Sequence, residues 1–351
     1  ILDMVESKNE NQYFSTLEKY LKSTIEVSKI DMMRGNYKEA EHKILKIISI
    51  TKQYTQFKAV YLQACVLIMN LYDLTGEIEK IIEISEGAKR NFTGEPSFVI
   101  SESNILNFEA TYYWRKGQNE KAIELALSII ELLEKSLKKQ KNEETLHVLM
   151  NSYYTIAKAY SYAGDYKFSF KYYDKTVEFA SILNEKMIMS HAIIDKADDL
   201  YNLTEYDKAL VLANKALDIR KSIGDNNIVF ILLTLGRIYI KKQQYSIAKE
   251  NLNKALDISH KINSDTHIPT LYCDLALILI KERDFENAEE YIKKAISNAE
   301  IKNEIFDMGY AYRTYGIFFV EQKNIFDSCK YFEKSISYFA SSGYKHYEMI
   351  S

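Results

Sequence analysis

His191 and the aspartates that follow it have the residue types and spacing of a metal site. His191, Asp195 and either Asp198 or Asp199 stand at i, i+4 and i+7 or i+8, which places them on one face of a helix. Imidazole and carboxylate groups arranged in this way can bind a divalent cation. No fourth ligand is evident, so we favour the alternative, a polar stripe that faces a groove or the solvent.

The sequence contains no recognisable catalytic motif. It has no glycine-rich phosphate loop, no HExxH pair, no GxSxG nucleophile and no Cys/His set with zinc spacing. Cys65, Cys273 and Cys329 are widely separated and form no CxxC pair. We therefore expect no enzyme activity and no cofactor, and the cysteine pattern favours a reducing, cytoplasmic location.

The charge balance limits the classes of partner. The 46 basic and 49 acidic residues give a net charge of -3, whereas a nucleic-acid surface needs a basic excess. We expect no nucleic-acid contact by this chain. No apolar run approaches 18 residues, so we also expect no membrane span. Residue 1 is Ile rather than Met, which suggests a fragment of a longer protein.

A short pattern recurs through the chain and indicates the elements that position these side chains. It consists of a small polar turn, then an aromatic or aliphatic residue, then a small residue three positions later, as in Gly164-Asp165-Tyr166 with Ser169. Glycine allows the backbone to leave a helix at such a turn. The turns fall at residues 35, 76, 117, 164, 204, 243, 283 and 323.

This spacing predicts a single domain over residues 1–351 made of helix–turn–helix units with a period of about 40 residues. The chain has only two prolines, so helix can continue nearly throughout. Small residues near the middle of the first helix in units three to eight let the paired helices approach closely. They are Ala110, Ala157, Ala197, Gly236, Ala276 and Gly316. The eight units cover approximately 11–52, 54–92, 100–140, 145–186, 187–225, 226–264, 265–303 and 304–342.

The turn, Tyr and Ala spacing resembles the tetratricopeptide repeat (TPR). The stretches from Gly164 to Thr176 and from Tyr245 to Ala255 are the most similar. The period is longer than the usual 34 residues of the TPR, as in the ligand-binding domains of Gram-positive peptide-pheromone-responsive regulators of the Rap/PlcR/NprR kind. The resemblance implies an all-α fold, a right-handed α-solenoid superhelix of about eight TPR-like hairpins.

In TPR proteins the first helix of each hairpin lines a concave groove, and the resemblance therefore implies a set of groove residues. They are Asn70, Asn104, Asn107, Trp114, Arg115, Asn151, Tyr154, Lys158, Asp198, Asn202 and Arg237. An Asn side chain both donates and accepts, so a row of them can hold a peptide backbone. Arg115, Lys158 and Arg237 could bind carboxylates.

Two of these assignments have structural alternatives. Asn is frequent throughout this sequence, including at Asn214 and Asn253 outside the groove positions. Trp114, the only tryptophan, is either an anchor for a ligand or a packing residue.

The groove positions of the last three units are more apolar than the others. They include Phe230, Leu233, Ile240, Leu277, Ile280, Ile317 and Val320. If exposed, such a stretch marks an interface, and it would allow a homodimer through the C-terminal repeats. The alternative is that these positions do not face the groove.

Two irregular segments are interpreted as surface insertions. The first is residues 91–98, which contain Pro96. The second is the charged stretch from Lys135 to Glu144, which we expect to extend the second helix of the third unit.

We therefore expect a non-catalytic module that binds a short peptide or a protein segment. The resemblance implies the sensor domain of a cytoplasmic peptide-responsive regulator in transcription or signalling, with an output domain before residue 1. The alternative is a general interaction scaffold or the sensory part of a larger signalling protein, since one fold serves many functions.

Overall fold

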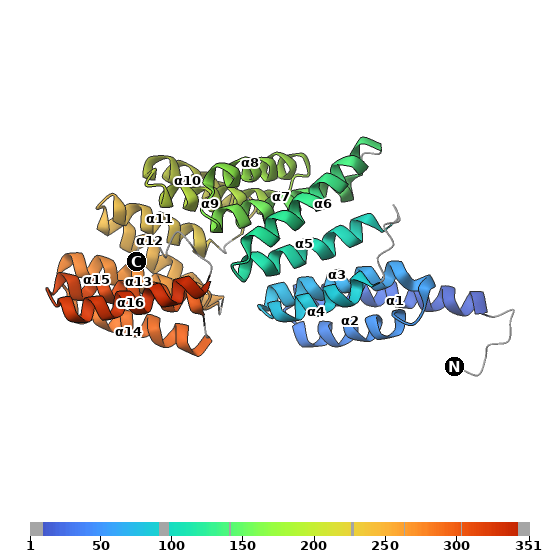
Figure 1. The fold of residues 1–351 in the computed structure, drawn as a ribbon, viewed down its shortest axis with the longest axis horizontal. Helices are drawn as coiled ribbons and strands as arrows, with labels where there is room; N and C mark the ends of the chain where they lie inside the picture. Colours follow the sequence, from blue (N-terminus) through green and yellow to red (C-terminus); the bar gives the residue numbers. More distant parts are fainter. Residues whose placement is uncertain are drawn as a thin grey trace. The chain divides into compact units, whose positions relative to one another are not determined.

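Sixteen α-helices arranged in consecutive pairs make up the part of the chain that the structure, a computed structural model, describes (Figure 1). The described residues are 10–90, 98–139, 142–225, 228–262, 264–302 and 304–342. The first helix of each pair is helix A and the second is helix B. The pairs are α1 (Glu10–Met33) with α2 (Tyr37–Thr51), α3 (Lys58–Thr75) with α4 (Ile78–Lys89), α5 (Val99–Arg115) with α6 (Asn119–Lys139), α7 (Glu143–Tyr162) with α8 (Tyr166–Ile182), α9 (Lys186–Asn202) with α10 (Tyr206–Ser222), α11 (Val229–Lys241) with α12 (Tyr245–Lys261), α13 (Ile268–Glu282) with α14 (Phe285–Lys302), and α15 (Ile305–Glu321) with α16 (Ile325–Ser342).

The turn between helices A and B has the same backbone geometry in all eight pairs. Each predicted turn residue has a positive φ, which confirms the repeat pattern. In the first four pairs the residue is glycine, but in the last four it is Thr204, Gln243, Arg283 or Lys323, with φ from 58° to 64°. Such a conformation costs a residue with a Cβ roughly 1–2 kcal/mol.

A backbone hydrogen bond closes turns such as that at Gln243 and offsets that cost. The residue after the left-handed position donates its N–H to a carbonyl in the last turn of helix A, as Gln244 does to Tyr239 at 2.9 Å. Glu77 makes the equivalent bond to Tyr72, also at 2.9 Å. This is the Schellman arrangement, which satisfies carbonyl groups that the helix end leaves open.

Small residues bring helices A and B together as the sequence predicted. A Cβ on Gly236 would lie 2.6 Å from Leu252 of α12, and a Cβ on Gly316 would lie 2.7 Å from Phe332 of α16. The alanines Ala157 and Ala276 are fully buried at the same position of other pairs. The pairs therefore pack too closely for larger side chains at these points.

The chain divides into two compact units, which we describe separately. The N-terminal unit comprises residues 1–115 and 121–155, and the C-terminal unit comprises residues 116–120 and 156–351. The core of the N-terminal unit is centred on α3, with Leu62, Ile68 and Leu71 almost fully buried. The core of the C-terminal unit includes Leu232 and Leu252.

One helical segment of the described residues, Thr55–Thr75, is long and apolar enough to span a membrane by length and composition alone. It has a mean hydropathy of 1.2, so the sequence contains a longer apolar window than we expected. In the structure 61% of this window is buried against other helices. Such burial is the ordinary situation of a core helix.

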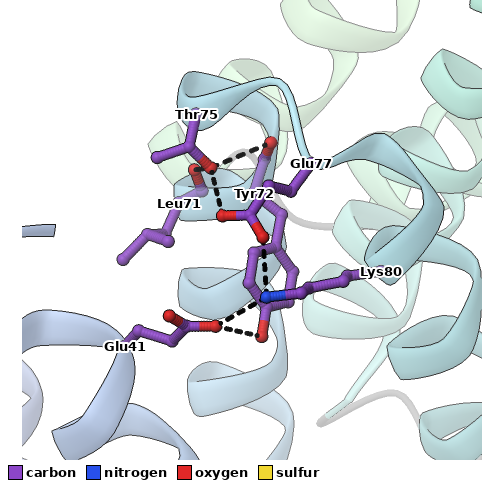
Figure 2. A network of polar contacts seen from close by, with 6 residues as sticks. All are labelled: Glu41, Leu71, Tyr72, Thr75, Glu77 and Lys80. Atoms are coloured by element: carbon purple, nitrogen blue, oxygen red, sulfur yellow. Dashed lines mark hydrogen bonds and ion pairs between the residues drawn. The ribbon is translucent and has the colours of Figure 1, made fainter. Parts of the chain in front are cut away.

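Polar contacts join the first two pairs at their surface. Figure 2 shows Lys80 of α4 between Glu41 of α2 and Glu77, at 3.0 and 2.6 Å. The hydroxyl of Tyr72 on α3 donates to the same Glu41 carboxylate at 3.0 Å. Three helices from two repeats therefore share one charged network.

The two irregular segments lie partly outside the described residues. Residues 91–97 of the first are not described. In the second, α6 continues to Lys139, which confirms the expected extension of that helix B, and residues 140–141 are not described.

Candidate functional site

The aspartates that the sequence suggested as metal ligands are engaged in other contacts. Asp195 forms an ion pair with Lys158, with 3.1 Å between Oδ1 and Nζ. Asp198 forms an ion pair with Arg237, with 3.1 Å between Oδ1 and Nη1. Asp199 is buried, accepts hydrogen bonds from the hydroxyls of Ser161 and Ser169, and has a pKa raised to about 7 by burial. No group of three His, Cys, Asp or Glu side chains in the described ranges is placed to hold a metal ion.

Three of the predicted groove asparagines line one pocket of the N-terminal unit. Asn70 of α3, Asn104 of α5 and Asn151 of α7 come from three successive A helices and surround a pocket of about 470 Å³. We call it the amide pocket. Asn70 and Asn151 are exposed and Asn104 is half-buried. The remaining lining residues are Ile25, Glu26, Lys29, Gln63, Val66, Leu67, Ser101, Phe108 and Glu144.

The composition of the amide pocket suits an extended peptide. Its primary amides, those of the three asparagines and Gln63, can each pair with both the N–H and the C=O of a peptide unit. Apolar side chains such as Phe108 and Val66 provide contact area for ligand side chains. The charged groups at the pocket include the pair Lys29–Glu26, whose ammonium and carboxylate lie 2.7 Å apart.

Asn107, which was predicted to face the groove, is buried and contacts a neighbouring helix. Its side chain is 7% exposed, and its amide donates to the Ser152 hydroxyl of α7 at 2.8 Å. The Asn107 Oδ1 atom is buried and has no hydrogen-bond donor among the described residues. Trp114 and Tyr154 are half-buried and do not line the amide pocket. The Arg115 guanidinium lies 5.4 Å from the Trp114 ring centre.

The three basic side chains predicted to bind carboxylates each pair with a carboxylate of a neighbouring repeat. Arg115 of α5 contacts Asp73 of α3 at 2.9 Å. The Lys158–Asp195 pair joins α7 to α9, and the Arg237–Asp198 pair joins α11 to α9. Each of these ion pairs connects two consecutive A helices.

A second pocket, in the C-terminal unit, contains two predicted residues, Asn202 and Arg237. It has a volume of about 210 Å³ and is formed by α9, α11, α13, α15 and the start of α10. We call it the basic pocket. Its lining residues are Tyr201, Asn202, Thr204, Tyr206, Arg237, Ile240, Lys241, Asp274, Leu277, Tyr310 and Arg313.

At the base of the basic pocket lies a buried charge network. The Arg237 guanidinium stands 4.6 Å from the Tyr201 ring centre, and Asp274 Oδ1 accepts the Tyr310 hydroxyl at 2.7 Å. Burial raises the pKa of Asp274 to about 6, opposed chiefly by Arg237. Sequence reasoning missed Asp274, Tyr310 and Arg313, although charged residues within the apolar helices α13 and α15 were an available signal.

The apolar positions expected in the last three A helices differ in burial, and Phe230, Ile240, Leu277 and Ile317 are half-buried. Leu233 and Ile280 are 2% and 1% exposed, so they belong to the core. Val320 is 52% exposed. A homodimer through these repeats therefore stays a prediction.

Family models described as tetratricopeptide repeat match residues 188–261 and 269–301. The chain contains tetratricopeptide repeats. The matched segments cover α9 to α12 and most of α13 and α14. The remaining pairs share the TPR turn and spacing. Comparison with curated proteins gives no significant sequence match.

Solved structures with a similar fold include the following three. A Rap protein in complex with competence and sporulation factor has a TM-score of 0.69 and 12% identity, over 95% of each chain. The apo form of RapI has a TM-score of 0.64 and 17% identity, over 80% of this chain and 98% of that one. The apo quorum sensor NprR from B. thuringiensis has a TM-score of 0.59 and 15% identity, over 92% of this chain and 99% of that one. At these identities the likeness establishes the fold.

Proposed function

We propose that this chain is a non-catalytic TPR module that binds a short peptide or an extended protein segment on its A helices. The observation that carries the proposal is the convergence of Asn70, Asn104 and Asn151 on one pocket. Their side-chain amides come from three successive A helices, so a peptide bound in the pocket would contact several of them at once. They can hold its backbone largely independently of its sequence.

We further propose that the module is the sensor domain of a cytoplasmic peptide-responsive regulator in transcription or signalling. Its similarity in fold to a Rap protein complexed with competence and sporulation factor and to the quorum sensor NprR supports this role. Its free cysteines, of which Cys329 is exposed, fit a reducing compartment.

Native mass spectrometry tests the kind of ligand. The purified chain is incubated with a mixture of hexapeptides randomised at every position, and with a peptide-rich culture filtrate. A mass gain of one short peptide per chain supports peptide binding. Capture of a folded protein without any peptide adduct would favour the scaffold instead.

The regulatory role needs a second experiment, because a sensor must change its conformation or dynamics when its ligand binds. Hydrogen–deuterium exchange with and without a captured peptide measures this change. Protection that spreads to helices outside the amide pocket supports a sensor. Protection confined to α1, α3, α5 and α7 would contradict it.

A further inference from the structure

The basic pocket of the C-terminal unit carries an excess of positive charge. Three basic side chains, Arg237, Lys241 and Arg313, line it together with one acidic side chain, Asp274. Arg237 and Asp274 lie at its base, being 7% and 1% exposed. Lys241 is exposed and Arg313 is half-buried. Lys241 is therefore accessible to a ligand and Arg313 is partly so, whereas Arg237 and Asp274 are almost fully enclosed by the protein.

Arg237 is held in place by groups of the protein itself. Its guanidinium contacts Asp198 at 3.1 Å and stands over the rings of Tyr201 and Tyr310, at 4.6 and 5.8 Å from their centres. It is a fixed positive charge at the base of the pocket. Lys241, by contrast, makes no ion pair with any residue that the structure describes.

The surroundings of Lys241 favour the arrival of an anion. Although Lys241 is exposed, the protein around its ammonium displaces part of the surrounding water, and this desolvation is the main cause that lowers the pKa of Lys241. The positive charges of Arg313 and Arg237 lower this pKa further. A lysine whose pKa is lowered by neighbouring cations lies in a region of positive potential. An anionic ligand group placed between Lys241 and Arg313 would reduce this repulsion.

Asp274 supplies a second recognition group, a carboxylate that accepts hydrogen bonds, whereas Lys241 and Arg313 are cationic donors. Its Oδ1 atom accepts the Tyr310 hydroxyl, but no donor among the described residues is within hydrogen-bond distance of its buried Oδ2 atom. The nearest charged nitrogen, Arg237 Nε, is 3.9 Å away. A buried carboxylate oxygen without a donor is costly, and a ligand N–H would satisfy it.

We propose that the basic pocket binds a carboxylate of the peptide ligand through Lys241 and Arg313, with an adjacent ligand N–H donating to Asp274 Oδ2. The last residue of a peptide combines a carboxylate and an N–H in this way, and so does an internal Asp or Glu. The pocket volume of about 210 Å³ is below the roughly 300–1,000 Å³ of whole-ligand sites, so it accommodates one residue of a peptide. This inference rests on the proposed peptide-binding function.

The test uses two randomised hexapeptide mixtures, one with a free C-terminal carboxylate and one with a C-terminal amide. Bound peptides are recovered from the wild-type chain, from Lys241→Gln and from Arg313→Gln, and are sequenced by mass spectrometry. Lys242→Gln is the matched control, because Lys242 precedes the same turn, pairs with Asp207 at 2.5 Å and does not line the pocket.

For the wild type we expect either preference for the free-acid mixture, which identifies the C-terminus, or enrichment of Asp and Glu from both mixtures, which identifies a side chain. Each pocket variant should weaken binding of the selected peptides roughly tenfold, as expected for loss of one charge-assisted contact. Lys242→Gln should bind like the wild type.

Two different failures can be distinguished. If the wild type binds neutral amidated peptides as well as acidic ones, and the pocket variants do not change this, the carboxylate proposal is wrong and peptide binding stands. If the wild type binds no peptide from either mixture, the proposed function itself fails, and the carboxylate proposal fails with it.

Discussion

Arg237 of α11 donates to Asp198 of α9 at 3.1 Å, and so links the A helices of two consecutive repeats. The same guanidinium is the nearest counter-charge to the buried Asp274 of α13, with Nε at 3.9 Å from Oδ2. One side chain thus connects three repeats of the C-terminal unit. We therefore expect Arg237 to contribute to the stability of the folded protein.

Replacing Arg237 by Met should destabilise the protein by about 2–3 kcal/mol, because the buried Asp274 loses its compensating charge. Asp198→Asn should cost less than about 1 kcal/mol, since the Asp198 side chain is 22% exposed and the amide oxygen still accepts. Urea denaturation measures both. Equal losses for the two variants would show that the Asp274 contact is unimportant.

Gly236→Ala should destabilise the protein by about 1–3 kcal/mol, because its Cβ would lie 2.6 Å from Leu252. Gly87→Ala in α4 is the matched control, since its Cβ would meet only the Tyr61 hydroxyl, at 4.0 Å. That control should be stabilised by about 0.5–1 kcal/mol through helix propensity. Thermal unfolding of both variants compares the two effects, and a neutral Gly236→Ala would contradict the close helix approach.

Gln243→Gly should stabilise the protein by about 1 kcal/mol, because Gln243 has a φ of 58° at the turn between α11 and α12. The reverse change, Gly164→Ala at φ 79°, should destabilise by a similar amount. If both variants unfold at the denaturant concentration of the wild type, the turn is not under backbone strain.

Asp199 should make the protein less stable as the pH rises from about 4 to 7. Its pKa is raised from 3.8 to about 7 in the folded state by burial, so the folded state binds more protons than the unfolded state within this window. The slope is at most about 1.4 kcal/mol per pH unit. Asp199→Asn should therefore be more stable than the wild type at pH 8 and close to it at pH 4. A difference that is the same at both pH values would contradict this assignment.

The turns and the pairing of helices could be predicted because they depend on local sequence. A residue such as Gly164 followed by Tyr166 and Ser169 fixes one turn, and the period of about 40 residues fixes the rest. Even the non-glycine turn at Lys323 followed from its place in the repeat. The same spacing predicted Asn104 and Asn151 as groove residues, and both line the amide pocket.

The partners of the basic groove residues could not be predicted in this way. Whether Arg115 meets Asp73 depends on how far one repeat is rotated against the next, and the period does not specify that rotation. Asn107 has the same residue type as Asn104 but lies three positions further along the helix, where it packs against Ser152. Its burial depends on the neighbouring repeat.

The central claim is that a peptide binds at the amide pocket. It is tested most directly by the affinity of the double variant Asn104→Ala/Asn151→Ala for hexapeptides that the wild type captures. The control is Asn253→Ala, at an exposed position of α12. We predict a loss of at least about tenfold for the double variant, from the loss of two amide contacts. Its thermal stability should be close to that of the wild type, because Asn151 is exposed and Asn104 is only half-buried. Unchanged affinity in the double variant would show that peptides do not bind at the amide pocket.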